Sequence, residues 1–205
     1  MSSTACNVFV VCRFRPLNVR EKEASASNAD KNELKLDIQD AEVTVVRDSG
    51  RDSGNTFTLD KVFDPDSQQR DIYEHVARKT IADITDGFNG TIFAYGQTGS
   101  GKTFTMMGPD LAGDPDLAGI IPRSILDIFD YIAADDSETE FTIKCAFMEI
   151  YNERIHDLVE KQPGNLQVRE HPSRGVYVDG LQEVPVSRPE VRARKSACMY
   201  TPARV

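Results

Sequence analysis

The sequence of 205 residues contains no tryptophan, three histidines and four cysteines. The cysteines stand at positions 6, 12, 145 and 198, a spacing that matches neither a zinc site nor a dense disulfide framework. We therefore expect free thiols in a reducing compartment, which makes the cytoplasm the default location.

Long apolar runs are also missing. No stretch approaches the roughly 20 residues that a membrane-spanning helix needs. The first residues, Met-Ser-Ser-Thr-Ala-Cys, lack the positive start and the apolar core of a secretion signal. We expect no membrane partner and no secretion, and the length suits a soluble protein with one sizeable core.

Acidic residues outnumber basic ones, and the formal net charge is −9. The basic residues are unevenly placed, because residues 188–205 hold five of them against a single acid, Glu190. The remainder of the chain is more acidic still and would repel a polyanion. We therefore expect no nucleic-acid partner.

Strands and helices are expected to alternate along the chain. Apolar periodicity predicts helices at about Ser67–Asp86, at Ile121–Ile132 and, in a short form, at Lys102–Met107. Arg20–Lys35 is polar and is expected to be a surface loop. Strands are expected at 7–14, 42–47, 56–63, 91–95, 141–151, 165–170 and 175–186. This alternation predicts an α/β fold with helices on both faces of one sheet.

The segment from Gly96 to Thr103 fits the phosphate-binding pattern G-x-x-x-x-G-K-[ST]. Its residues are Gly96, Gln97, Thr98, Gly99, Ser100, Gly101, Lys102 and Thr103. The glycines let successive backbone N–H groups point at phosphate oxygens. Lys102 would reach the outer phosphates, and the Thr103 hydroxyl would bind a magnesium ion. A chance Gly/Ser-rich turn is the alternative, but four fixed positions match and an apolar run precedes them.

The position of this loop narrows the class of nucleotide-binding protein. It follows 95 residues of chain, whereas small kinases carry a phosphate loop after their first strand. The Asn-Lys-x-Asp motif that reads guanine in GTPases is absent from the sequence. Both observations favour an ATPase whose phosphate loop lies deep within its sheet.

Several motifs, in order, resemble the kinesin motor domain, with the conventional, N-terminal-motor type the most similar. The matching segments are Val10–Asn18, Asn89–Met106, Gly119–Arg123, Met148–Leu158 and Gly175–Leu181. The resemblance runs from about residue 7 to residue 187. It implies a P-loop NTPase-type sheet flanked by helices, ATP and Mg²⁺ as cofactors, and microtubule-stimulated ATP hydrolysis that drives movement along microtubules.

The resemblance also implies roles for individual residues. Arg13, Arg15 and Pro16 match the Arg-x-Arg-Pro segment that lines the adenine side of the nucleotide pocket. A solvated basic pair at a strand end is the alternative reading of these arginines. The predicted nucleotide contacts continue from Gly96 through Thr103 to Phe104, with Lys102 and Thr103 also predicted to be catalytic.

Arg154 and Arg174 lie in segments that correspond to the tubulin-binding edge hairpins of the family. They are candidates for contacts with the acidic microtubule surface. Solvated surface arginines are an equally weighted alternative. Asp179 stands where conventional members often carry lysine, which weakens a basic patch.

Two nucleotide-sensing motifs of the family, Asn-x-x-Ser-Ser-Arg-Ser-His and Asp-Leu-Ala-Gly-Ser-Glu, do not occur in the sequence. Asp-Leu-Ala-Gly at 116–119 lacks the Ser-Glu continuation and comes too soon after the phosphate loop, so we expect an ordinary turn there. The fold is therefore expected to be incomplete, and the alternative function is a hydrolysis-deficient fragment that binds nucleotide or tubulin.

Residues 188–205 do not resemble the family and contain two prolines. We expect a partial motor domain at 1–187 followed by a loose basic tail, as in a truncated or misspliced kinesin. A stalk, a cargo site and a dimer partner are not expected to be encoded here. The expected location is the cytoplasm and the microtubule cytoskeleton.

Overall fold

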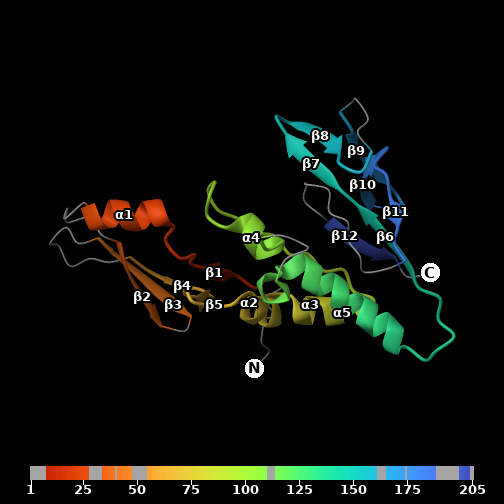
Figure 1. Ribbon diagram of the computed structural model, residues 1–205. Coiled ribbons are helices and arrows are strands. Elements are labelled where there is room, and N and C mark those ends of the chain that lie inside the picture. The colour runs from red at the N-terminus through yellow and green to blue at the C-terminus, as the bar shows by residue number, and fades with distance from the viewer. Residues whose placement is uncertain are drawn as a thin grey trace, which may run out of the picture.

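The computed structural model describes residues 8–27, 34–39, 41–47, 55–109, 114–160, 165–173, 175–187 and 199–203. The helices are α1 (Val19–Ser27), α2 (Gln69–Val76), α3 (Arg78–Thr85), α4 (Lys102–Met106) and α5 (Ile120–Ala134), with a 3₁₀ turn, η1, at Pro115–Leu117. Figure 1 shows the β2–β4 strands and α1 at one end of the molecule and the β7–β10 strands at the other, with α2, α3 and α4 between them.

The strands form small sheets. The first half of the chain holds β1 (Val11–Arg13), β2 (Leu34–Gln39), β3 (Glu42–Arg47), β4 (Asn55–Thr58) and β5 (Lys61–Phe63). The second half holds β6 (Thr142–Ala146), β7 (Met148–Tyr151), β8 (Arg154–Asp157), β9 (Gln167–His171), β10 (Gly175–Asp179), β11 (Val184–Pro185) and β12 (Met199–Ala203). β1 pairs in parallel with β5. The other sheets are antiparallel: β2-β3-β4, β7-β8, β9-β10 and β11-β6-β12.

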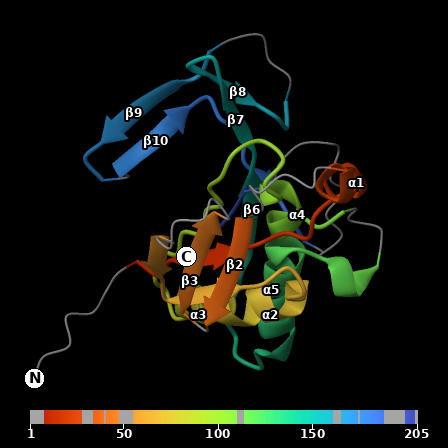
Figure 2. The ribbon, with the colours of Figure 1, turned by 90° about the vertical axis from the view of Figure 1, so that its left-hand side faces the viewer.

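Two apolar clusters hold the helices against the strands. The larger contains Phe63, Ile72, Tyr73, Ala77 and Ile120, so that it joins β5, α2 and α5. Burial of such side chains stabilises the fold by roughly 1.5–3 kcal/mol each. The smaller cluster joins α3, α5 and β6 through Ile81, Ile128 and Ile143. Figure 2 shows α2, α3 and α5 lying together, as these clusters require.

The long helix predicted at Ser67–Asp86 is two helices, α2 and α3. They meet at Ala77, whose φ of −105° departs from the helical value. Ala77 is fully buried, and its small side chain lets both helices approach the same core. The predicted helices around Lys102 and Ile121 are confirmed as α4 and α5.

The prediction of a surface loop at Arg20–Lys35 is wrong. Its first part is α1 and its end belongs to β2. α1 begins after Asn18, whose side-chain carbonyl accepts a hydrogen bond from the Glu21 N–H, while the Glu21 carboxylate accepts one from the Asn18 N–H. This reciprocal capping satisfies N–H groups that a polar sequence would otherwise leave to water.

Residues 91–95 were predicted to be a strand, but no strand is assigned there. A strand is defined by pairing, and within the described ranges no neighbour pairs with this segment. Phe93 and Tyr95 are 78% and 95% exposed. The strand predicted at 141–151 is also divided, since β6 and β7 on either side of Phe147 belong to different sheets.

Residues 188–205 were predicted to be a loose tail, and the structure describes five of them, 199–203. They form β12, which pairs antiparallel with one side of β6 while β11 pairs with the other. Pro202 is compatible with this edge position, because an edge strand needs no N–H on its outer side. The rest of 188–205 lies outside the described residues.

Three further findings concern the described residues only. No helix there is long and apolar enough to span a membrane. No group of His, Cys, Asp and Glu side chains there has the arrangement of a metal site. Cys12 and Cys145 form no disulfide, and burial raises the pKa of both thiols.

Candidate functional site

The predicted phosphate loop lies between the segment 91–95 and α4. Gly99 and Gly101 have φ values of +81° and +98°, in the left-handed region that favours glycine. The Ser100 N–H donates to the Gln97 carbonyl at 3.2 Å, which closes a turn with Gly99 at its third position. A positive φ at that position is typical of a type II turn.

The Lys102 ammonium group is folded back over this loop. Its Nζ atom lies 2.7 Å from the Gly96 carbonyl oxygen and 2.9 Å from the Gln97 carbonyl oxygen. The only positive side chain of the loop is therefore held at its mouth by weak, neutral acceptors. A phosphate oxygen would be a stronger acceptor for this ammonium group.

The first turn of α4 contributes backbone donors. Its first internal hydrogen bond runs from the Thr105 N–H to the Gly101 carbonyl. The N–H groups of Lys102, Thr103 and Phe104 precede this bond, so the helix itself offers them no acceptor. The Thr103 side chain is exposed beside them. The loop thus combines an ammonium group, backbone N–H groups and a hydroxyl.

Arg13 points from β1 toward α4. Its Nη1 atom donates to Gln69 Oε1 at 2.7 Å and to Thr105 Oγ1 at 2.9 Å, and its guanidinium lies 5.3 Å from the centre of the Phe104 ring. Burial lowers the pKa of this guanidinium. Arg13 therefore ties β1 to the helix that follows the phosphate loop.

Gln69 completes this contact from α2. It is 4% exposed, and its Nε2 atom donates to the carbonyls of Phe104 at 2.7 Å and Leu117 at 3.0 Å. The side chain is thus bonded through both of its polar atoms. It holds α2, α4 and η1 in one arrangement behind the phosphate loop.

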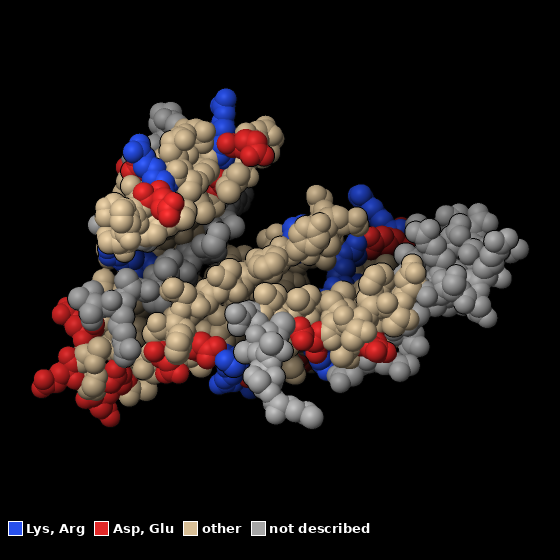
Figure 3. Space-filling model, turned by 180° about the vertical axis from the view of Figure 1, so that it is seen from behind, with Lys and Arg blue, Asp and Glu red and all other residues tan. Residues whose placement is uncertain are grey.

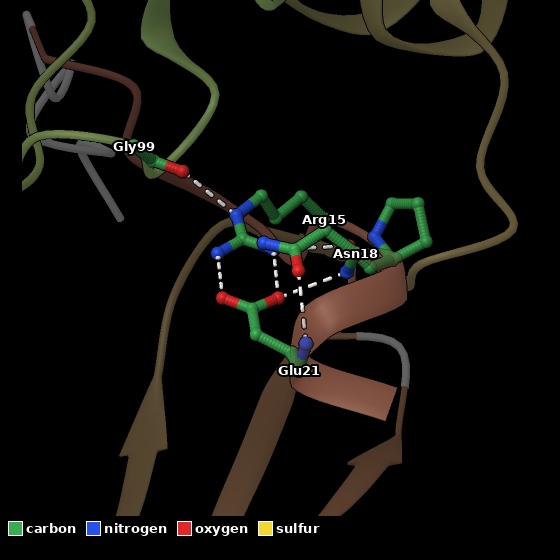
Figure 4. Close-up of polar contacts among 5 residues, drawn as sticks. Arg15, Asn18, Glu21 and Gly99 are labelled. Carbon is green, nitrogen blue, oxygen red and sulfur yellow. Dashed lines mark hydrogen bonds and ion pairs between the residues drawn. The ribbon is translucent and has the colours of Figure 1, made fainter. Parts of the chain in front are cut away.

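Arg15 contacts the phosphate loop directly (Figure 4). Its Nε atom donates to the Gly99 carbonyl at 2.8 Å, while Nη1 and Nη2 bind the two oxygens of Glu21 at 2.7 and 2.6 Å. Nη1 also donates to the Pro16 carbonyl at 3.1 Å. The hydrogen bond to Glu21 raises the pKa of Arg15.

A cavity of about 190 Å³ joins these elements. Seven of the predicted nucleotide residues line it: Arg13, Arg15, Pro16, Ser100, Gly101, Lys102 and Phe104. Apolar side chains of β1, α2, α5 and the segment 91–95 form much of the remaining wall, among them Val11, Ile72 and Ile92. Residues far apart in the chain are therefore gathered around one opening.

The predicted tubulin contacts lie elsewhere. Arg154 is exposed at the start of β8, in the region opposite β2–β4 in Figure 1. It follows a two-residue turn, Asn152-Glu153, in which both residues have positive φ. Arg174 lies outside the described residues. Asp179 pairs with Arg169 across the β9–β10 hairpin at 2.9 Å, which offsets a nearby positive charge.

Glu21 and Gln69 belong to this site but were not predicted from the sequence, and the cap that Asn18 forms at the start of α1 was not predicted either. The pattern Asn18-x-x-Glu21 is a recognisable helix-capping signal and could have revealed α1. No sequence signal distinguishes Gln69 from an exposed glutamine, because its importance arises from burial between three segments.

Comparison with known proteins gives a consistent family. The family profile described as "Kinesin motor domain" matches residues 13–195, which extends past residue 187, the boundary expected from the sequence. The chain is 46% identical over 181 residues to the kinesin heavy chain of Botryotinia fuckeliana, covering 88% of this chain and 20% of that protein. It is 43% identical over 185 residues to kinesin-related protein 3 of Dictyostelium discoideum, covering 90% of this chain and 15% of that protein.

A solved structure of a fast kinesin has the same fold. It superposes with a TM-score of 0.79 at 42% identity, covering 89% of this chain and 49% of that chain. The present chain therefore spans about half of the solved structure and a fifth or less of these two curated relatives.

Proposed function

This chain belongs to the kinesin motor domain family and has its α/β, P-loop NTPase-type fold, and on that premise we propose that it binds ATP with Mg²⁺ at the loop Gly96–Thr103. The observation that carries the proposal is the geometry of Lys102. Its ammonium group lies at the mouth of a glycine-rich turn and donates to two backbone carbonyls there.

The donor set fits a triphosphate. Lys102 supplies a positive charge, and the first N–H groups of α4 supply further donors to phosphate oxygens. The exposed Thr103 hydroxyl would hold Mg²⁺, which neutralises phosphate charge when it is bound. Lys102 would exchange its carbonyl partners for phosphate oxygens, and Phe104 lies where α4 leaves the loop.

Arg13, Arg15 and Pro16 are proposed to form the adenine side of the site. All three line the cavity beside Lys102. The aliphatic and aromatic wall of this cavity suits a planar base, whereas the basic groups lie toward the loop. The guanidinium groups of Arg13 and Arg15 already donate to protein acceptors. We therefore expect these arginines to contact the base through their aliphatic stems.

The nucleotide proposal is tested by replacing Lys102 with alanine. Removing this charge-assisted contact should weaken ATP binding roughly tenfold to a hundredfold. Isothermal titration with Mg-ATP measures the change, and Lys22→Ala removes an exposed lysine of α1 as a matched control. Unchanged affinity in Lys102→Ala, with the control also unchanged, would show that the triphosphate has another partner.

As part of a kinesin motor, the chain is proposed to take part in microtubule-stimulated ATP hydrolysis that drives movement along microtubules in the cytoplasm. A second candidate is a nucleotide- or tubulin-binding fragment without turnover. The specific observation in its favour is that both nucleotide-sensing motifs of the family are missing from the 205 residues.

Phosphate release with and without microtubules separates these candidates. Stimulated release that is abolished by Lys102→Ala supports the motor enzyme. ATP binding without any release supports the fragment.

Tubulin is the proposed protein partner, with Arg154 and Arg174 as candidate contacts. In Figure 3 acidic side chains gather at one end of the molecule. The loop after α5 contributes Asp135, Asp136, Glu138 and Glu140 there. This end would be repelled by an acidic microtubule surface, whereas the exposed Arg154 lies in a different region. Microtubule co-sedimentation of Arg154→Ala, compared with Lys79→Ala on α3, tests the contact.

A further inference from the structure

The start of α1 is tied to the phosphate loop through Arg15 and Glu21 (Figure 4). The two Glu21 oxygens bind both terminal nitrogens of Arg15, and the remaining guanidinium nitrogen, Nε, donates to the Gly99 carbonyl. A paired guanidinium–carboxylate contact fixes direction as well as distance. Glu21 therefore determines where the Nε–H of Arg15 points.

Glu21 is itself held in place by the helix it begins. Its Oε2 atom accepts from the Asn18 N–H at 2.9 Å, and its own N–H donates to Asn18 Oδ1 at 2.9 Å. The hydrogen bond from Arg15, with that from the Asn18 N–H, lowers the pKa of Glu21 to about 2. The carboxylate thus remains charged at every pH at which the protein would work.

The orientation of the Gly99 carbonyl also sets the orientation of a backbone N–H in the phosphate loop. The planar peptide unit between Gly99 and Ser100 carries this carbonyl on one side and the Ser100 N–H on the other. Gly99 has φ +81°, and a Cβ added to it would meet no atom within 4 Å, so no side chain packs on that side of the residue. The hydrogen bond to Gln97 holds the Ser100 N–H side of this unit, and the hydrogen bond from Arg15 holds its carbonyl side.

We propose that Glu21 is a positioning residue for nucleotide binding, which holds the Arg15 guanidinium against the Gly99 carbonyl and thereby fixes the tip of the phosphate loop. Glu21 acts without touching the nucleotide. This inference rests on the proposed nucleotide function of the loop, and it adds a role for Arg15 that is independent of the base.

The test is Glu21→Gln in the 205-residue chain, with Mg-ATP, Mg-GTP and magnesium tripolyphosphate as ligands. Glutamine keeps the size of the side chain but loses the paired, charged acceptor. If the loop tip is what Glu21 controls, binding of all three ligands should weaken by a similar factor, roughly three- to thirtyfold. Competition against a fluorescent ATP analogue measures each affinity.

Two controls separate this role from helix stability. Glu23→Gln makes the same change of charge on an exposed side chain of α1. Asn18→Ala removes the side-chain acceptor of the Glu21 N–H but keeps the backbone N–H of residue 18, which donates to the Glu21 carboxylate, so that the contact of Glu21 with Arg15 is retained. Both should keep the affinity for all three ligands within about twofold of the parent, although Asn18→Ala should lower the melting temperature.

Three results would overturn the inference alone. These are an unchanged affinity in Glu21→Gln, a loss confined to ATP that spares tripolyphosphate, and an equal loss in Asn18→Ala. The second would show that Arg15 acts on the base, and the third that Glu21 acts only through helix stability. Failure of the parent chain to bind any of the ligands would instead refute the proposed function, and this inference with it.

Discussion

At the residue scale, the region behind the phosphate loop depends on one buried amide side chain. Gln69 accepts from Arg13 and donates to two carbonyls, so three segments share a single residue. Each of these partners would lose a hydrogen bond if the amide were removed. A buried polar group that loses its partner costs more than the bond contributes while it is made.

Replacing Gln69 with leucine tests this arrangement. Leucine fills a similar volume but leaves the guanidinium of Arg13 and the carbonyls of Phe104 and Leu117 with fewer partners. The free energy of unfolding should fall by about 2–3 kcal/mol, measured by urea denaturation. Gln182→Leu, at an exposed position, is the matched control. Equal stability of the two variants would mean that water replaces the amide without cost.

Residue-scale predictions from the sequence depend on local patterns. The residues of the phosphate loop share a fixed spacing, and seven of the predicted nucleotide residues do line one cavity. Asn18 and Glu21 also follow a local pattern, the capping pair, but the polar composition of 20–35 concealed it. Gln69 has no local signal, since its partners lie 35 to 56 residues away in the chain.

At the element scale, tight turns place the edge hairpins. β7 and β8 are joined by Asn152 and Glu153 alone, with φ values of +48° and +60°. Two positive φ values suit a type I′ turn, whose twist matches that of the paired strands. Asparagine tolerates this conformation, but glutamate does so only at a cost. The pairing of β7 with β8 outweighs that cost.

Glu153→Gly should therefore stabilise the hairpin. Glycine removes the steric cost of a left-handed glutamate, about 1–2 kcal/mol, and offsets part of this gain by its greater freedom when unfolded. A net gain of about 0.5–1 kcal/mol is expected in thermal or urea unfolding. Asn152→Gly should give a smaller gain, because asparagine already accepts this backbone. A loss of stability in Glu153→Gly would show that the glutamate side chain has a stabilising contact.

At the scale of the whole molecule, the family fold was predictable but the pairing of its strands was not. The alternation of apolar runs gave the α/β class, and the comparisons confirm it. Which strand lies beside which depends on partners far along the chain. The segment 91–95 has the composition of a strand, yet within the described part of the chain it has no pairing partner.

This segment and the residues just before it and before β1 carry much exposed apolar surface. Phe88, Phe93 and Tyr95 are 68%, 78% and 95% exposed, and Phe9 is 56% exposed. Exposed aromatic side chains beside unpaired backbone groups favour association between chains. The 205-residue chain is therefore expected to self-associate as its concentration rises.

Size-exclusion chromatography with light scattering over a concentration series tests this expectation. The double variant Phe93→Ser with Tyr95→Ser should shift the onset of association to a concentration several-fold higher, because it removes two exposed aromatic rings from one segment. Phe57→Ser on β4, where the ring is 54% exposed, is the control and should change the onset less. If the parent chain stays monomeric throughout, the exposed surface around 91–95 does not promote association between chains. If Phe57→Ser acts as strongly as the double variant, association arises from general hydrophobicity and not from this unpaired segment.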